Sequence, residues 1–152
     1  MKHHDILIVG SGVIGTTLAN SLKSDDLSIG IIDSVGSPKF SKRHLSINSN
    51  SLNFLKKLDL WHLIKPNAFP YETIKVWDQE GSGFIEFNSI DTERENLGHI
   101  VCEGDIQKFA LNALNEKQIS FYWENNLEEV KKESSEIICC LLYTSPSPRD
   151  LS

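Results

Sequence analysis

Three glycines near the start of the sequence have the spacing of a dinucleotide-binding loop. The stretch reads GxGxxG and consists of Gly10, Ser11, Gly12, Val13, Ile14 and Gly15. In such a loop the first glycine permits a tight turn, the second lets a pyrophosphate approach the backbone, and the third lets the next helix pack closely. The helix N-terminus supplies amide donors and a partial positive charge to the phosphates. The motif therefore predicts a dinucleotide site.

An acidic residue completes this pattern. Asp33 ends the next apolar run, eighteen residues after Gly15. A carboxylate at this place accepts hydrogen bonds from the ribose hydroxyls of the adenosine half, and its charge disfavours a 2′-phosphate. The residues therefore argue against NADP in this site. FAD and NAD both fit on these grounds, while an ordinary strand-to-helix turn without a ligand is the less favoured alternative.

The elements around the motif can be predicted from their hydrophobic periods. Residues 5–9 form a continuous apolar run, typical of a strand buried on both faces of a parallel sheet. A helix is expected from Val13 to about Lys23, and residues 27–33 read as a second buried strand. The expected apolar face of the helix consists of Ile14, Leu18, Ala19 and Leu22. Together these segments predict a βαβ unit.

Further elements follow a loop at residues 34–42. Asn50 is the expected N-cap of a helix that carries Leu52, Leu55 and Leu58. Residues 73–87 alternate around a glycine-rich turn and predict an antiparallel hairpin. A helix starting near Asp105 and strands at 98–101, 119–123 and 136–139 complete the expected elements. Three residues in these patterns are expected to serve packing rather than ring stacking: Trp61, Trp77 and Trp123.

Composition excludes several classes of function. The 152 residues carry a formal net charge of −6, with 39% hydrophobic and 24% charged residues, which fits a globular protein and argues against a nucleic-acid partner. The three cysteines and five histidines have no metal-ligand spacing, so no metal site is expected. The longest apolar runs are too short for a bilayer span and no secretory signal is evident. We therefore expect a cytoplasmic protein without a transmembrane segment.

Four segments in order resemble the FAD-dependent aromatic hydroxylases of ubiquinone biosynthesis, the UbiH type, within the para-hydroxybenzoate-hydroxylase class of flavoprotein monooxygenases. They are DILIVGSGVIGTTLANSL, RHLSINSNSLNFLKKLDLWHLI, YETIKVWDQEGSGFIEF and LGHIVCEGDIQKFALNAL. The resemblance runs from Asp5 to about Cys139 and implies the N-terminal part of a Rossmann-like α/β FAD-binding domain, with a parallel sheet and an antiparallel hairpin insertion. It favours FAD over NAD as the bound dinucleotide.

The resemblance also implies further cofactor-binding residues. Arg43 matches the family arginine beside the flavin and the pyrophosphate, and Gln107 matches the polar residue that reaches the FAD phosphate or ribitol. Leu127 matches the position where the backbone borders the adenine. The sequence departs from the family pattern at Asp59, which replaces a glycine, and at His99, which replaces a tyrosine. Asp33 stands where the family more often has a glutamate, and at Cys102 and Glu103 the usual family glutamate is shifted by one place.

The implied reaction is hydroxylation of a prenylated phenol. NAD(P)H would reduce the FAD, O₂ would supply the oxygen atom, and other ubiquinone-biosynthesis proteins would be possible partners; in the full-length protein the resemblance leaves a peripheral membrane location open. No catalytic residue can be assigned from spacing. The alternatives are another two-motif flavoprotein, of the amine oxidase or geranylgeranyl reductase type, or a stand-alone dinucleotide-binding module.

The last residues predict a non-native tail. The stretch CLLYTSPSPRD, Cys140 to Asp150, is what one reading frame of a transposase sequencing-library adapter encodes. We therefore expect residues 1–139 to be the N-terminal part of an FAD-binding domain and residues 140–152 to be adapter-derived. On this interpretation the chain is a fragment that is inactive by itself. A flexible native C-terminus is the alternative.

Overall fold

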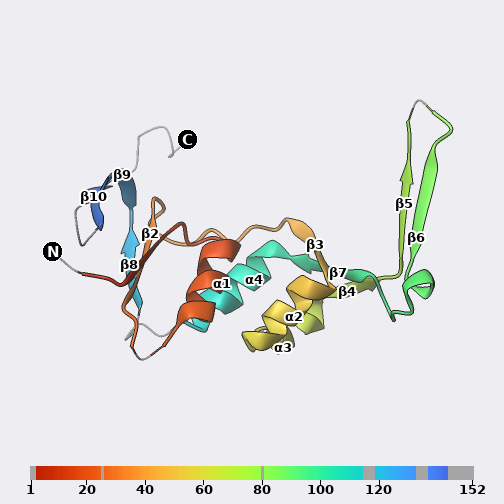
Figure 1. Cartoon of the computed structure of the whole chain (residues 1–152), viewed down its shortest axis with the longest axis horizontal. Coiled ribbons are helices and arrows are strands. Elements are labelled where there is room, and N and C mark those ends of the chain that lie inside the picture. The colour runs from red at the N-terminus through yellow and green to blue at the C-terminus, as the bar shows by residue number, and fades with distance from the viewer. Residues whose placement is uncertain (1–2, 25, 80, 115–118, 133–136, 144–152) are drawn as a thin grey trace. The chain divides into compact units, whose positions relative to one another are not determined.

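The computed structural model describes residues 3–24, 26–79, 81–114, 119–132 and 137–143. The chain divides into two compact units (Figure 1). The first unit combines residues 1–39 with residues 110–152, and the second consists of residues 40–109. The first unit is therefore discontinuous in sequence, whereas the second is a single stretch.

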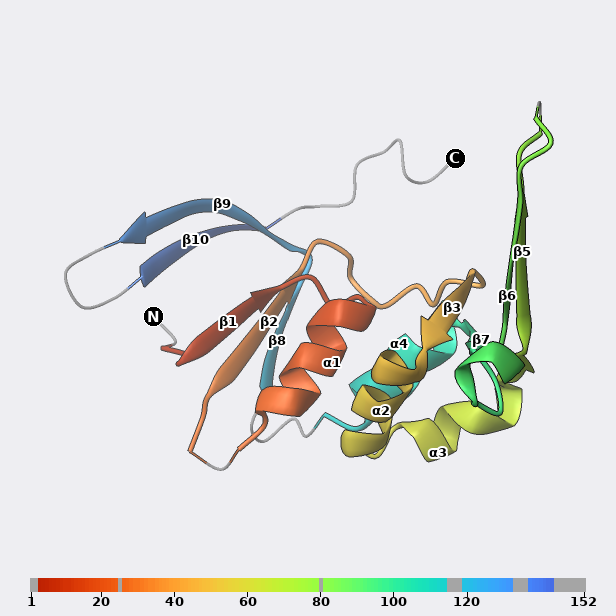
Figure 2. The same cartoon turned by 45° about the vertical axis from the view of Figure 1, so that its right-hand side comes forward.

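A three-stranded parallel sheet forms the centre of the first unit. Its order is β1 (Ile6–Val9), β2 (Ile29–Asp33) and β8 (Ile119–Trp123). Helix α1 (Val13–Leu22) connects the first two strands and lies over one face of the sheet, as Figure 2 shows. The parallel pairing of β1 and β2 confirms the predicted βαβ unit.

The core of the first unit lies between this sheet and α1. Its buried members are Ile8, Ala19, Ile29, Ile31, Leu114 and Ile119. The central strand is buried along its length, but Val9 on β1 is 58% exposed. The expectation that β1 is buried on both faces was therefore wrong: Ile8 packs into the core, whereas Val9 points to the opposite face of the strand and is exposed.

Helix α1 has close to the predicted length and buries only part of the predicted apolar face, since Ala19 and Leu22 pack in the core but Ile14 and Leu18 do not. Ile14 is 80% exposed and Leu18 is 42% exposed, whereas Thr16 and Asn20 are buried. The polar side chains tolerate burial because they bond to backbone: Thr16 Oγ1 donates to Gly12 O at 2.8 Å, and Asn20 Nδ2 donates to Thr16 O at 2.9 Å and to the carbonyl oxygen of Ala110 at 2.8 Å. The period of the apolar residues predicted the wrong orientation for Ile14 and Leu18, because the close contact between Gly15 and the carbonyl oxygen of Gly10 sets which side of the helix meets the sheet.

Two further strands of the first unit form an antiparallel hairpin. They are β9 (Asn125–Lys132) and β10 (Ile137–Tyr143), with a register shift between Cys140 and Leu141. Sequence reasoning missed β9, since its glutamates and lysines show no apolar alternation. The predicted strand at 136–139 is confirmed from Ile137, and the pairing continues through residues 140–143. Residues 144–152 of the predicted tail lie outside the described residues.

The second unit holds a small antiparallel sheet and short helices. The strands lie in the order β3 (His44–Asn48), β7 (Gly98–Cys102) and β4 (Phe69–Tyr71); β7 was predicted, but β3 and β4 were not. The helical segments are α2 (Ser49–Lys57), α3 (Trp61–Ile64), η1 (Lys65–Asn67), η2 (Ile90–Thr92) and α4 (Glu103–Asn112), whose last residues belong to the first unit. The buried apolar residues of this unit are Ile47, Leu55, Leu60, Trp61, Ile64, Val101 and Ile106.

Two helix starts differ from prediction. The N-cap of α2 is Asn48, whose Oδ1 accepts a hydrogen bond from Ser51 N at 3.0 Å, and not Asn50, which lies within the helix. Asparagine at either place would read as a cap, so the sequence could not separate them. Helix α4 begins at Glu103, two residues before the expected Asp105.

The end of α2 is a Schellman turn built around a non-glycine residue. Leu60 N donates to Leu55 O at 2.9 Å, and Asp59 N donates to Lys56 O at 3.0 Å. Asp59 lies at φ 56°, in the left-handed region that glycine prefers. The aspartate that departs from the family pattern therefore occupies a position where the backbone itself favours glycine.

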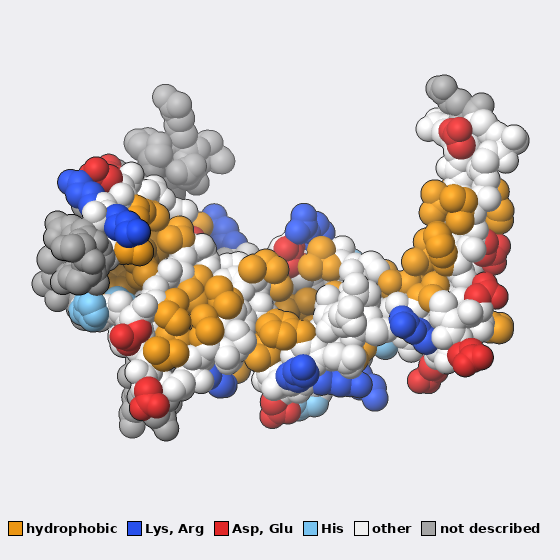
Figure 3. Space-filling view, in the orientation of Figure 1, with side chains coloured by type: hydrophobic (Ala, Val, Ile, Leu, Met, Phe, Trp, Pro, Cys, Tyr) orange, Lys and Arg blue, Asp and Glu red, His pale blue; other side chains and the backbone are white. Residues whose placement is uncertain are grey.

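A hairpin of β5 (Thr73–Trp77) and β6 (Phe84–Asn88) confirms the predicted antiparallel pair. The registers Ile74↔Phe87 and Val76↔Ile85 place four apolar side chains on one face, and each is at least 40% exposed. Figure 3 shows apolar side chains along this hairpin. Trp77 on the opposite face is 69% exposed, so its expected packing role was wrong. No helix among the described residues is long and apolar enough to cross a membrane.

Candidate dinucleotide site

The glycine loop connects β1 to α1 with the geometry that the motif predicts. Gly10 lies at φ 100°, a conformation that side chains disfavour, and its amide donates to Ile32 O at 2.8 Å. A Cβ at Gly15 would overlap the carbonyl oxygen of Gly10 and would lie 3.3 Å from Ile8 Cγ2. This contact fixes the side of α1 that faces the strand.

Gly12 differs from Gly15, because it borders open space. It is the N-cap of α1 at φ −65°, and a Cβ placed on it would meet no atom of the described residues within 4 Å. The next three amides, of Val13, Ile14 and Gly15, belong to the first turn and have no acceptor within the helix. Open space over a helix N-terminus is the arrangement that a diphosphate requires.

Asp33 lies at the carboxyl end of β2 and is bound to the same loop. Its Oδ2 accepts hydrogen bonds from Ser11 N at 2.7 Å and from Ser11 Oγ at 2.6 Å, while Oδ1 accepts from Val35 N at 3.2 Å. Ser11 is buried, with 1% of its surface exposed. The carboxylate is therefore held in one orientation beside the glycine loop.

These contacts keep Asp33 ionised. Partial burial raises the pKa of its carboxyl, but the hydrogen bonds from Ser11, Val35 and Ser34 outweigh burial, so the pKa lies below its ordinary value. A charged carboxylate at neutral pH is a strong acceptor for vicinal hydroxyls and repels a phosphate. The electrostatics thus agree with the selectivity expected from the sequence.

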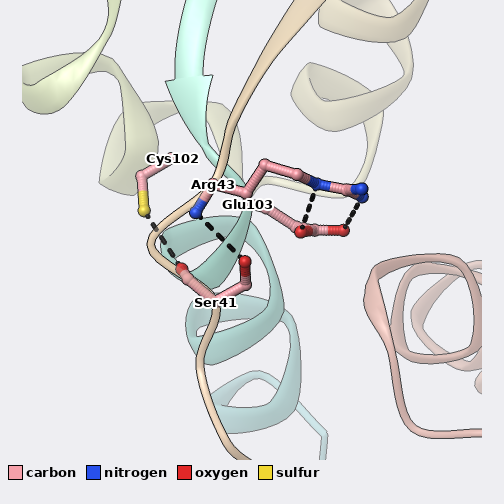
Figure 4. A network of polar contacts seen from close by, with 4 residues as sticks. All are labelled: Ser41, Arg43, Cys102 and Glu103. Carbon is pink, nitrogen blue, oxygen red and sulfur yellow. Dashed lines mark hydrogen bonds and ion pairs between the residues drawn. The ribbon is translucent and has the colours of Figure 1, made fainter.

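Arg43 forms a network of its own within the second unit (Figure 4). Its Nε and Nη2 donate to Glu103 Oε2 at 3.1 Å and to Oε1 at 2.8 Å, a bidentate pair. The backbone supports this pair, since Glu103 N donates to Arg43 O at 2.8 Å and Gly104 N donates to Ser41 O at 3.1 Å. Hydrogen bonding to Arg43, against a smaller opposing effect of desolvation, lowers the pKa of Glu103. Glu103 is the glutamate that lies one place away from its position in the family pattern, and its pair with Arg43 was not predicted from the sequence.

The predicted site residues are therefore divided between the two units. The first unit brings the glycine loop and Asp33 together. Leu127 lies on β9 of the same unit and is half-buried. Arg43 and Gln107 belong to the second unit, where Gln107 lies on α4.

Two kinds of comparison relate this geometry to known proteins. The flavin-dependent monooxygenase PieE, solved in complex with FAD and substrate, matches with a TM-score of 0.72 at 11% identity, over 91% of this chain and 26% of that chain. No model of a known protein family matches the chain. The structural match, at this low identity, defines the fold: the chain has the Rossmann-like FAD-binding fold of flavin-dependent monooxygenases.

The sequence comparisons are more specific than the fold. The chain is 31% identical to the mitochondrial ubiquinone biosynthesis monooxygenase COQ6 of Danio rerio over 119 residues, which cover 70% of this chain and 24% of the relative. It is 23% identical over 145 residues to the ubiquinone hydroxylase UbiM of Neisseria meningitidis, covering 88% of this chain and 32% of that protein. These matches confirm the resemblance to the UbiH-type aromatic hydroxylases. The chain spans less than a third of the length of these relatives.

Proposed function

We propose that this chain is the FAD-binding part of an aromatic hydroxylase that acts on a prenylated phenol in ubiquinone biosynthesis. The observation that carries the proposal is the glycine loop, with open space at Gly12 and the oriented Asp33 carboxylate beside it. The likeness to COQ6 and UbiM supports the substrate class and the use of O₂. NAD(P)H as reductant rests on the family resemblance.

The residues of the first unit fit the adenosine diphosphate half of FAD. The first-turn amides of α1 would hold the pyrophosphate, with Gly12 leaving room for close approach, and Asp33 would accept hydrogen bonds from ribose. Ser11 would fix the orientation of this carboxylate. On the family resemblance alone, Arg43, which is paired with Glu103, is a further candidate for cofactor binding. When bound, FAD supplies the redox chemistry that activates oxygen.

Two measurements test the proposed function. In the first, the 152-residue chain is titrated with ADP by calorimetry, and we expect binding that the variant Gly12→Ala abolishes. In the second, the full-length protein is purified, and we expect a flavin absorption band and reductant-dependent O₂ consumption that a prenylated phenol stimulates. Absence of flavin from the full-length protein would refute the proposal, and ADP binding without O₂ consumption would favour a dinucleotide-binding module.

We also propose that residues 140–152 are adapter-derived. The eleven-residue match to a translated adapter supports this. Sequencing the source DNA across the codons of Cys139 and Cys140 tests it. We expect the source DNA not to encode the residues after Cys139, whereas genomic DNA that encodes LLYTSPSPRDLS would refute the proposal.

A further inference from the structure

The second unit carries its charges in two separate stretches. Residues 40–71 contain five Lys or Arg and a single acidic residue, whereas residues 72–109 contain three Lys or Arg and nine Asp or Glu. The basic stretch stands out in a chain whose formal net charge is −6. Charge asymmetry of this kind indicates a surface that meets an anionic partner. The charged residues of the basic stretch are Lys42, Arg43, Lys56, Lys57, Asp59 and Lys65.

Three of these lysines lie close together on the helical part of the unit. Lys56 and Lys57 end α2, and Lys65 follows α3 at the start of η1. Desolvation is the main cause that lowers the pKa of His99, and the charges of Lys56 and Lys65 add to it against an opposing effect of Glu95. Both lysines therefore act on the same imidazole. Figure 3 shows Lys and Arg side chains gathered over α2 and α3. Among the residues that the structure describes, none of the three lysines forms an ion pair.

Exposed apolar side chains lie among these lysines. Phe54 is 41% exposed and lies one helical turn before Lys57, on the same side of α2. Leu63 on α3 is 38% exposed. The one acidic residue of the basic stretch is Asp59, whose Oδ1 lies 3.2 Å from His62 Nδ1 on α3. The outward surface of the two helices is therefore basic and partly apolar.

The core of the second unit fixes the orientation of this surface. Leu55 on α2, Leu60 between the helices, and Trp61 and Ile64 on α3 are all buried. The Trp61 ring meets the His99 ring of β7 edge-on, with ring centroids 5.1 Å apart. Because these side chains point into the unit, the exposed residues between them face outward. We call this outward surface the lysine face, and it consists of Phe54, Lys56, Lys57, His62, Leu63 and Lys65, all of which are exposed.

We infer that the lysine face docks on an anionic lipid surface. This inference goes beyond the proposed function and does not require the dinucleotide site. Surfaces that lie in a membrane interface combine lysines, which meet anionic headgroups, with Phe and Leu side chains that enter the boundary with the acyl chains. The aliphatic stems of lysines let both kinds of contact form together. An acidic protein would also suit the lysines, but it would need a continuous packed contact around Phe54 and Leu63. A fluid headgroup layer adapts to two single apolar side chains.

The test measures binding of the 152-residue chain to vesicles by cosedimentation. Vesicles of phosphatidylcholine are compared with vesicles of equal parts phosphatidylcholine and phosphatidylglycerol. We expect binding to the anionic vesicles that weakens as salt is added. Lys57→Gln and Lys65→Gln should each weaken it about fivefold, the effect of one basic side chain at such a surface, and Phe54→Ser should also weaken it. Lys75→Gln is the matched control, because it removes the same charge from the hairpin, where Lys75 Nζ lies 3.5 Å from Glu86 Oε2. This control should bind like the original chain.

Several results would overturn the inference. One is a folded original chain that does not bind the anionic vesicles, and another is an equal loss of binding in Lys75→Gln. Binding that survives Lys57→Gln and Lys65→Gln but is lost in the double variant Val76→Lys and Ile85→Glu would assign the contact to the hairpin instead. Loss in the lysine variants with no change in Phe54→Ser would indicate a purely electrostatic contact, as with an acidic protein, and not a lipid surface.

The dinucleotide site is tested separately. Lys57→Gln and Lys65→Gln should bind ADP like the original chain, because neither residue belongs to the unit that carries the glycine loop. Failure of vesicle binding and failure of ADP binding are therefore distinguishable.

Discussion

Replacing the glycines of the loop one at a time should separate folding from ligand binding. Gly15→Ala places a methyl group against the carbonyl oxygen of Gly10, with Gly10 C at 3.1 Å and Ile8 Cγ2 at 3.3 Å. The overlapped atom belongs to the backbone, so no side-chain rotation can relieve it. Overpacking of this kind costs about 1–3 kcal/mol. Gly15→Ala should therefore destabilise the first unit by that amount.

Gly12→Ala is the matched control. A methyl group at Gly12 meets no atom within 4 Å in the described part of the chain, and φ −65° suits alanine. The remaining cost is the poorer N-cap preference of alanine, at most about 1 kcal/mol. The same methyl group would stand where a diphosphate must approach. Gly12→Ala should therefore keep the fold and lose ADP binding.

Urea unfolding with unit-specific probes measures the difference. Trp123 reports on the first unit and Trp61 on the second, so their fluorescence can be followed in single-tryptophan variants, with far-UV circular dichroism as the common signal. Gly15→Ala should lower the midpoint of the first-unit transition and leave the second unchanged. A Gly15→Ala protein within 0.5 kcal/mol of the original, or a Gly12→Ala protein less stable than Gly15→Ala, would refute the reasoning.

Three further predictions concern the second unit. Asp59→Gly should stabilise it by about 0.5–1 kcal/mol, because the left-handed φ of 56° is unfavourable for aspartate. Asp59→Ala should instead destabilise it. The midpoints of urea unfolding of the two variants measure both effects. His99 Nδ1 is buried without a hydrogen-bond partner among the residues that the structure describes, and desolvation lowers the pKa of His99 below 6.5, so the unfolded state takes up the proton first. The free energy of unfolding should therefore be highest above pH 6.5 and should fall as the pH drops below this value. A His99→Tyr variant that keeps this pH dependence would show that His99 is not its cause. The exposed apolar face of the β5–β6 hairpin should make the chain associate with itself in sedimentation experiments. Replacing the apolar pair Val76 and Ile85 by lysine and glutamate should reduce this association, whereas swapping Lys75 and Glu86 on the opposite hairpin face should not.

The local features of the fold could be predicted, whereas the face that each element buries often could not. Gly10, Gly15 and Asp33 define their own surroundings within one βαβ unit, so the loop followed from the sequence. The exposed Ile14 did not follow, because the contact between Gly15 and the Gly10 carbonyl decides which side of α1 meets the sheet. Strand β9 was missed because its register depends on pairing with β10 rather than on an apolar period.

The same distinction holds for the candidate site. The motif predicted that Asp33 would accept hydrogen bonds from ribose. It did not predict that Ser11 would orient the Asp33 carboxylate, since serine fits the variable position of a GxGxxG loop without any such role. The Arg43–Glu103 pair joins residues sixty positions apart, and the alignment of Trp123 with Asp33 joins residues ninety positions apart. Such pairings depend on the topology of the sheets, which residue spacing does not encode.

The discontinuity of the first unit has a consequence for synthesis. As the chain leaves the ribosome, residues 40–109 form a continuous stretch that can fold as soon as it emerges. The strand β2 must wait for β8, because Ile29 pairs with Ile119, and until then one edge of β2 stays unpaired. The unit that begins the sequence and carries the glycine loop is therefore the last to be completed.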